Sequence, residues 1–224
     1  MNRYTDKNRE AHNSIAAKRK AYYRILELLQ QKKIPESYPN TESGGHQLGQ
    51  ESLNIRSQLQ GLCGYCLLAY DWIRPLAEWI GQRKCLEIMC GSGALSKALQ
   101  NCGVDIKATD DYSWNDNHAV PWFRDSWTEI EQLNALQAIE IYGAEVDLVI
   151  CSWPFLSDDC YRALLKMREV NPAATMLYIG EWYGATASDA FFKAAQVVVE
   201  DAFTQAIKNF KSFYDIHDWP YLIR

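Results

Sequence analysis

Short apolar runs alternate with amphipathic stretches over most of the chain. Runs of this kind predict buried strands at residues 84–89, 104–109, 128–133, 146–152 and 174–180, with a C-terminal strand region at 212–224. Apolar residues at helical spacing predict helices between them, at 93–102, 135–142, 158–169 and 186–196. Strands that alternate with helices imply a mostly parallel sheet with helices on both faces.

The pattern before residue 84 is helical. A stripe of apolar residues predicts a helix over residues 8–33, which Pro35 stops. Residues 35–52 carry almost nothing apolar and indicate a linker, and further helical stretches precede the first strand. The predicted organisation is a basic N-terminal helix with a polar linker at 1–52 and a single α/β domain at 53–224.

Charge is distributed unevenly along the 224 residues. The formal net charge is −5, but residues 1–34 hold nine Lys and Arg against three acids, a net of +6. The remaining 190 residues hold 14 bases and 25 acids. A basic arm on an acidic body is compatible with three interpretations: the arm binds a nucleic acid or a partner protein, it docks onto the acidic body of the same chain, or it is simply a solvated helix.

Other sequence features narrow the class of protein. No apolar stretch approaches the roughly 20 residues of a membrane span, so no membrane association is expected. The seven cysteines lie singly or within apolar runs, which predicts reduced thiols and a cytoplasmic location. The pair Cys63 and Cys66 is interpreted as two partly buried thiols on a helix. The four histidines form no ligand-spaced cluster, so no metal site is predicted.

The segment 84–96 carries the most specific pattern. It predicts a buried strand containing Glu87, then a turn with Gly91 and Gly93, and then the start of a helix. The next predicted strand ends on Asp110. A strand, a glycine turn, a helix and a second strand that ends in a carboxylate form half of a nucleotide-binding unit.

Three features favour S-adenosylmethionine over a dinucleotide. The Glu87 carboxylate suits a cofactor with an α-amino group and a positive centre. Position 96, where a dinucleotide-binding turn would have its third glycine, is Ser96. The strand at 147–151 runs into the turn Ser152-Trp153-Pro154-Phe155. Over residues 70–224 this set resembles the class I (Rossmann-like) S-adenosylmethionine-dependent methyltransferases, and most closely an uncharacterised methyltransferase-like group with a Ser-Trp-Pro turn. The resemblance implies a mostly parallel, seven-stranded sheet.

The resemblance also implies a set of cofactor-binding residues. Asp110, with Asp111, would bind the ribose, and Asn134 with Ala135 would lie at the adenine, where Asp125 is the competing residue. The methionine moiety would be held by Glu87, Met89, Cys90, Gly91 and Gly93. Met89 stands where the family often has glycine, and a side chain there narrows the turn.

The turn at 152–155 is similar to the Asp/Asn/Ser-Pro-Pro-Tyr/Phe motif of methyltransferases that modify amino groups of bases or glutamine side chains. The resemblance implies that Ser152 accepts a hydrogen bond from the amine and that Phe155 stacks on a planar substrate. Trp153 replaces the first proline of that motif, before Pro154. Glu181 would bind a substrate amine or act as a base, or be a buried structural acid.

An aromatic segment follows Asp110. Tyr112, Trp114, Trp122 and Trp127 would form a lid over the site or pack in the core. The leading hypothesis is a methyltransferase acting on an amino group of a nucleic-acid base or a small planar molecule. The alternatives are a catalytically weak or inactive protein of the same fold that assembles through its basic arm, and a nicotinamide dehydrogenase.

Overall fold

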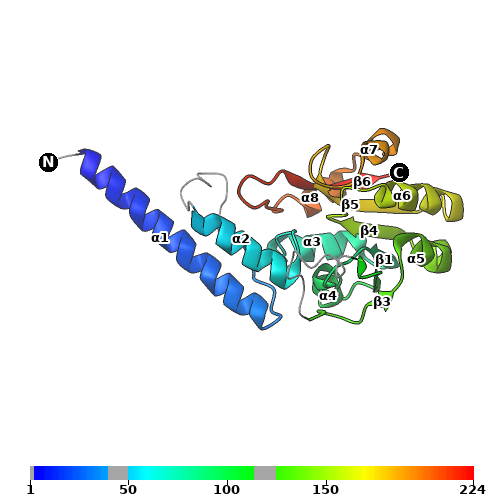
Figure 1. Cartoon of the computed structure of the whole chain (residues 1–224), viewed down its shortest axis with the longest axis horizontal. Helices are drawn as coiled ribbons and strands as arrows, with labels where there is room; N and C mark the ends of the chain where they lie inside the picture. The colour runs from blue at the N-terminus through cyan, green and yellow to red at the C-terminus, as the bar shows by residue number, and fades with distance from the viewer. Residues whose placement is uncertain (1–2, 40–49, 114–124) are drawn as a thin grey trace.

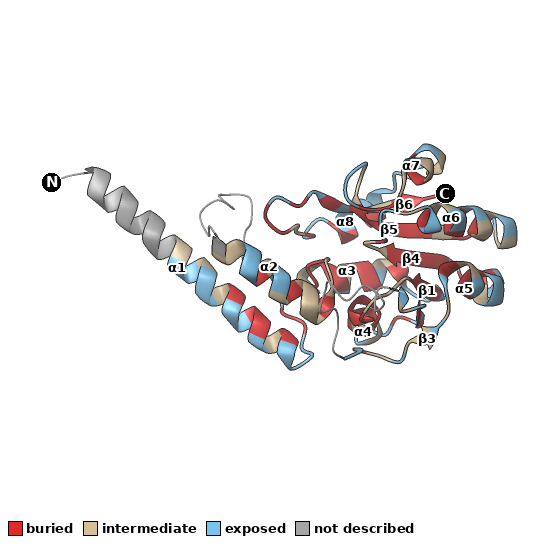
Figure 2. Cartoon of the chain, viewed as in Figure 1, coloured by how far each residue is buried: buried red, intermediate tan, exposed pale blue. Residues whose placement is uncertain are grey.

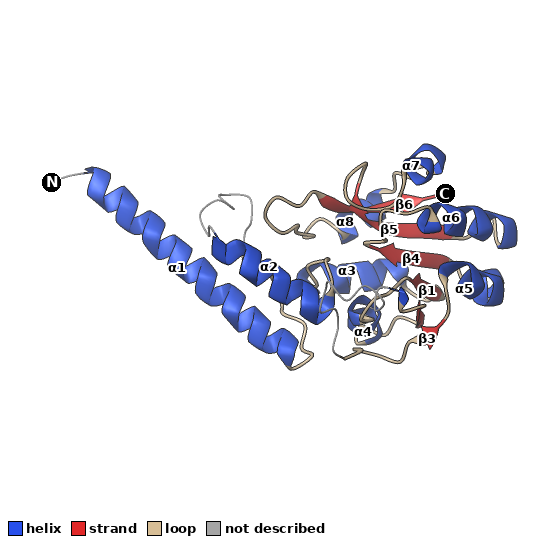
Figure 3. Ribbon diagram, in the orientation of Figure 1, coloured by secondary structure: helices blue, strands red, loops and turns tan. Residues whose placement is uncertain are grey.

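The computed structural model describes residues 3–39, 50–113 and 125–224, with side chains described from residue 15 in the first range and from 51 in the second. These residues form a six-stranded sheet of order β3-β2-β1-β4-β5-β6 (Figure 3). The first five strands are parallel and β6 is antiparallel to β5. The strands are β1 Cys85–Ile88, β2 Ile106–Asp110, β3 Glu131–Gln132, β4 Leu148–Ser152, β5 Thr175–Glu181 and β6 Asp218–Ile223.

Helices cover both faces of the sheet, and α1 extends well beyond it (Figure 1). The helices before the sheet are α1 Arg3–Gln30, α2 Gln50–Cys63 and α3 Tyr70–Ile80. The helices that come between strands in the sequence are α4 Ala94–Gln100, α5 Ala135–Tyr142, the 3-10 turn η3 Gly143–Glu145, α6 Asp159–Val170, α7 Asp189–Ala194 and α8 Asp201–Ala206. No helix of the described residues is long and apolar enough to cross a membrane.

The alternation of side chains along the strands divides the core into two layers. In β4, Leu148 and Ile150 pack with the helices α1–α4 and α8, while Val149 and Cys151 pack with α5, α6 and α7. All four of these residues are fully buried, as are the central strands around them (Figure 2). A sheet buried on both faces explains why its central strands read as continuous apolar runs.

The N-terminal helix is part of this core. Tyr22 and Leu29 are at most 1% exposed, and the ring of Tyr22 contacts the rings of Phe213 and Tyr214 near the other end of the chain. The first part of the predicted linker also packs, because Tyr38 is buried. The domain boundary at residue 52 stays a prediction, and residues 40–49 of the linker lie outside the described residues.

The structure corrects some predicted elements. Six strands are found among the described residues where seven were expected, because residues 212–217 precede β6 as a loop. The helix expected at 186–196 is only α7, since the side chain of Ser188 caps its N-terminus by accepting from the Phe191 backbone. The short helix α8 was not predicted. Its six residues are too few for a helical period to be read.

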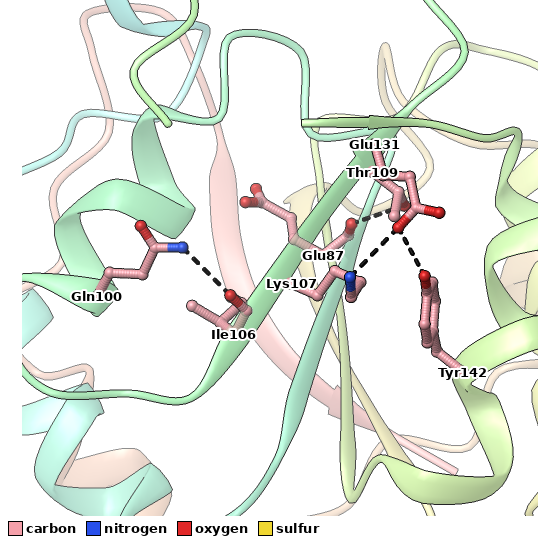
Figure 4. A network of polar contacts seen from close by, with 7 residues as sticks. All are labelled: Glu87, Gln100, Ile106, Lys107, Thr109, Glu131 and Tyr142. Carbon is pink, nitrogen blue, oxygen red and sulfur yellow. Dashed lines mark hydrogen bonds and ion pairs between the residues drawn. The ribbon is translucent and has the colours of Figure 1, made fainter. Parts of the chain in front are cut away.

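A polar network holds the short edge strand β3 in place (Figure 4). The Glu131 carboxylate lies 3.3 Å from Lys107 Nζ on β2 and accepts a 2.6 Å hydrogen bond from the Tyr142 hydroxyl on α5. On the neighbouring strand, Thr109 Oγ1 donates to the Glu87 carbonyl at 3.0 Å. These contacts align β3 and α5 with the carboxyl end of β2, where the candidate site lies.

Candidate active site

A cavity of about 580 Å³ lies at the carboxyl ends of β1, β2 and β4, within the usual size range of ligand sites. Glu87, Gly93 and Glu181 are not among its lining residues. The other predicted site residues all line it: Met89, Cys90, Gly91, Asp110, Asp111, Asn134, Ala135, Ser152, Trp153, Pro154 and Phe155. Parallel strands bring these segments together, because their carboxyl ends share one edge of the sheet.

Left-handed backbone conformations gather at this edge. Met89 (φ 52°) follows β1, Tyr112 (φ 59°) comes two residues after β2, and Trp153 (φ 54°) follows β4. Side chains in this region cost of order 1–3 kcal/mol each and persist where the surrounding structure imposes them, which is common at functional sites. Met89 therefore occupies a backbone conformation that favours glycine.

Asp110 joins the turns that follow β1 and β2. Its Oδ2 accepts a 2.7 Å hydrogen bond from the Gly91 N–H, and its Oδ1 accepts one of 2.7 Å from the Tyr112 N–H. These two bonds fix a largely buried carboxylate in the cavity wall. Asp111 is exposed, and its Oδ1 accepts from the Ser113 N–H at 2.9 Å.

Glu87 lies beneath the glycine turn. It is 1% exposed, and its Oε2 accepts hydrogen bonds from the Ser96 backbone N–H (3.0 Å) and from the Ser96 hydroxyl on α4. Burial raises the pKa of the Glu87 carboxyl to about 7, against the effect of these two bonds, which lower it. The structure therefore connects Glu87 to α4, and its predicted contact with the methionine moiety stays a prediction.

Gly93 is required by packing behind the turn. It has φ 70°, and a Cβ there would lie 3.0 Å from Thr128 Cγ2 and 3.2 Å from Ile130 Cδ1. A side chain at this position would push away the segment that leads into β3. Its predicted cofactor contact is likewise a prediction, because Gly93 does not line the cavity.

The turn at 152–155 is held from several sides. The Trp153 N–H donates to the Ile179 carbonyl at 2.7 Å, and its indole stacks on Tyr65 with ring centroids 4.7 Å apart and planes 14° apart. The indole Nε1–H donates to Asp218 Oδ2 at 2.8 Å. Asp218 is 2% exposed, and burial raises the pKa of its carboxyl. This set of contacts explains how the turn accommodates tryptophan where the related motif has proline.

The remaining residues of the turn face the cavity. Phe155 is 57% exposed and Ser152 is partly buried, so both are accessible from solvent through the cavity. An exposed phenylalanine in the wall of a cavity is an arrangement that a planar ligand can cover.

Glu181 lies outside the lining of the cavity. Its Oε2 accepts from the Ala185 N–H at 3.1 Å and its Oε1 accepts from the His217 N–H at 2.9 Å. The carboxylate closes the turn after β5 and ties it to the loop before β6. This position corresponds to a structural acid, and a direct catalytic role for Glu181 stays untested.

Asn134 both caps a helix and lines the cavity. Its Oδ1 accepts from the Gln137 N–H at 3.0 Å, while the Asn134 N–H donates to Gln137 Oε1 at 3.1 Å, a complete capping box at the start of α5. Asn134 and Ala135 also line the cavity, whereas the competing residue Asp125 is exposed and is not part of the wall.

Sequence reasoning missed several wall residues. Tyr65 was passed over as part of a Cys pair, and Arg56 and Arg162 lie on helices with no motif around them. Of the predicted aromatic lid, Trp127 belongs to the core, where its indole donates to the Leu62 carbonyl at 2.7 Å. Trp114 and Trp122 lie outside the described residues.

The thiols at the cavity do not have the character of nucleophiles. Cys63 and Cys66 are buried, and burial raises the pKa of the Cys63 thiol to about 12 and also raises that of Cys66. All seven cysteines are free. Within the described ranges, no three His, Cys, Asp or Glu side chains gather as metal ligands.

The strand order, the helices on both faces and a cavity at the carboxyl ends of β1, β2 and β4 together decide the architecture. The chain has a doubly wound, Rossmann-like α/β fold. No protein-family model matches the chain, and no curated protein matches it.

Solved structures that resemble the chain include a methyltransferase and two further proteins. The magnesium protoporphyrin IX methyltransferase of Synechocystis PCC 6803 is 12% identical, with a TM-score of 0.38 over 67% of this chain and 76% of that one. TehB of Haemophilus influenzae is 12% identical, with a TM-score of 0.41 over 75% and 66%. MtNAS is 12% identical, with a TM-score of 0.40 over 100% and 98%. No residue of this chain takes a role from these likenesses.

Proposed function

We propose that this chain is an S-adenosylmethionine-dependent methyltransferase that acts on an amino group of a nucleic-acid base or a small planar molecule. One observation carries the proposal. The glycine turn after β1, the carboxylate of Asp110 and the turn at 152–155 line one cavity of about 580 Å³. The first two suit a nucleoside cofactor and the third suits a planar amine.

The cofactor half of the cavity would be formed by the ends of β1 and β2. Asp110 is largely buried in the cavity wall at the end of β2, where its carboxylate would bind a ribose hydroxyl. The backbone at Cys90 and Gly91 would approach the methionine moiety closely. Asn134 and Ala135 would lie at the adenine, with the Asn134 oxygen already used in the helix cap.

The acceptor half would be formed by the turn at 152–155. The methyl group of the cofactor is bonded to a positively charged sulfur, and the neutral thioether that remains after transfer is a good leaving group. The protein has to orient the amine and exclude water. Ser152 would accept a hydrogen bond from the amine, and Phe155 would cover its planar face. The fixed conformation of Trp153 holds both residues in position.

The cofactor assignment has a direct test by calorimetry. S-adenosylhomocysteine should bind the purified chain with micromolar affinity, and NAD should not. Asp110→Ala should weaken this binding at least 100-fold, because the variant loses the ribose contact and the anchor of the Gly91 turn. Asp105→Ala, which removes an exposed carboxylate outside the cavity lining, should change the affinity less than threefold. Binding of NAD alone would contradict the proposal.

A second candidate function is assembly through the basic arm. Lys20 and Arg24 are exposed on α1, the helix that extends beyond the sheet (Figure 1). Deleting residues 1–34 would also remove buried Tyr22 and Leu29, so substitution of charges is the sounder experiment.

We expect Lys20→Gln/Arg24→Gln to weaken binding to a single-stranded oligonucleotide and to reduce the slope of log K against log[salt] by about 1–2. The control is Lys193→Gln/Lys208→Gln, which removes two charges elsewhere. An unchanged slope would exclude this face of α1 from nucleic-acid binding, and unfolding midpoints would confirm that all variants fold.

A further inference from the structure

Two arginines are the basic side chains of the cavity wall. Arg56 comes from α2 and Arg162 from the second turn of α6, and the described lining holds no lysine or histidine. Arg56 is half-buried and Arg162 is exposed at the rim. Two arginines from distant parts of the sequence thus line the same solvent-accessible cavity.

Neither guanidinium is neutralised within the described part of the chain. The ion pairs in that part of the chain use other cations, such as Arg19 with Glu51 and Arg74 with Glu36. Arg83 donates to backbone carbonyls, as does Arg168. The side chains of Arg56 and Arg162 make no hydrogen bond or ion pair to the described residues, so both keep their donors for a ligand.

The acids of the wall are engaged elsewhere. Asp110 accepts from two backbone N–H groups, and Asp111 accepts from the Ser113 N–H. Asp159, one helical turn before Arg162, accepts from the Ser157 hydroxyl at 2.8 Å and forms no ion pair with that arginine. The positive charge at the two arginines is therefore not cancelled by a nearby contact.

Both arginines lie on the acceptor side of the proposed site. Arg162 follows the turn at 152–155 on the helix that begins at Asp159. Arg56 also lines a small hollow together with Tyr65 and Trp153, and Tyr65 stacks on Trp153 of the same turn. Burial raises the pKa of the Tyr65 hydroxyl, and the charge of Arg56 acts in the opposite direction. The ribose side of the cavity, by contrast, carries Asp110 and Asp111.

Resting on the proposed function, we propose that the methyl acceptor carries an anionic group, a phosphate or a carboxylate, which Arg56 and Arg162 bind. A guanidinium matches the geometry of both anions and holds them through paired N–H donors. A planar amine lying against Phe155 would be oriented by this anion. The two arginines would then determine specificity and would take no part in the methyl transfer itself.

The test uses matched neutral and anionic amines on the full chain, with and without saturating S-adenosylhomocysteine. The pairs are 4-aminobenzamide with 4-aminobenzoate, and cytidine with cytidine 5′-monophosphate. We expect the anionic member to bind at least tenfold more tightly, and Arg56→Gln or Arg162→Gln to remove most of that advantage. Arg56→Lys and Arg162→Lys should keep part of it. Lys193→Gln controls for net charge and should keep all of it.

Each contrary result has a definite meaning. Equal binding of both members of each pair would overturn the anion site. A loss of S-adenosylhomocysteine affinity in the arginine variants, with no change in anion preference, would assign the arginines to the cofactor carboxylate and also overturn it. If S-adenosylhomocysteine does not bind at all, the proposed function fails, while the aminobenzoate titration without it still tests the anion site. A short oligonucleotide that binds more tightly than the mononucleotide would identify nucleic acid as the source of the phosphate.

Discussion

Replacing Trp153 by Phe should lower the free energy of unfolding by about 3 kcal/mol at pH 7, because it leaves the buried Asp218 carboxylate without its indole donor. The aromatic ring that stacks on Tyr65 is kept, so the loss reports mainly on the hydrogen bond. Urea unfolding of the two proteins measures it. The turn that positions Ser152 should loosen, and methyl transfer should fall more than cofactor affinity.

The pH dependence of this effect follows from the direction of the pKa. The folded-state pKa of Asp218 is raised above its unfolded value near 3.8, so ionising this carboxyl costs stability as the pH rises through the folded pKa. Loss of the indole N–H raises that pKa further. The destabilisation of Trp153→Phe should therefore be largest at neutral pH and smallest near pH 4.

Two further variants make the result decisive. Asp218→Asn in the Trp153→Phe background removes the buried charge and should recover at least half of the lost stability. Trp219→Phe is the matched control, because Trp219 is 39% exposed and its indole N–H makes no hydrogen bond to the described residues. It should cost less than 1 kcal/mol. Equal losses at Trp153 and Trp219 would exclude the Trp153–Asp218 pair as an anchor of the turn.

Glu87→Gln should be more stable than the unsubstituted chain at pH 8, by up to about 3 kcal/mol, and close to it at pH 4.5. The pKa of Glu87 is raised from 4.5 to about 7 in the folded state, so the folded chain binds the extra proton between these values. Stability contributed by this group is present below pH 4.5 and is lost as the pH rises through 7. Glutamine has no charge to bury and avoids that loss.

The measurement is the difference in unfolding free energy between the two proteins from pH 4.5 to 8. Glu145→Gln, on an exposed turn, should follow the unsubstituted chain throughout. A constant difference at all pH values would show that Glu87 is ionised at no cost. The affinity of the same variant for S-adenosylhomocysteine tests the predicted cofactor role, because a contact with the amino group requires the carboxylate.

Much of the scaffold follows from local sequence. The apolar run of β4 predicts a strand because both of its faces are buried, and the observed strand Leu148–Ser152 lies within the predicted one. Helix α5 has the predicted bounds, since Asn134 caps it and its apolar residues repeat at helical spacing. The glycines and Asp110 could be placed at one edge because parallel strands end together.

Side-chain direction and long-range pairing required the tertiary structure. Glu87 turns to Ser96 because the alternation along β1 points it at α4, which only the packed sheet shows. Trp153 meets Asp218 across 65 positions of sequence, and no local pattern encodes that contact. The same holds for Arg56 and Arg162. They lie on separate helices, and only the tertiary structure shows that both line one cavity.

By itself, then, the sequence determined the order of the six strands and of most helices, the glycine turn and the edge at which the site lies, because periodicity and turn chemistry act over a few residues. The tertiary structure decided which of those residues line the cavity and which support it from behind. It also decided that the basic N-terminal helix packs into the core through Tyr22 and its neighbours. These outcomes depend on packing between distant segments, which local periodicity does not record.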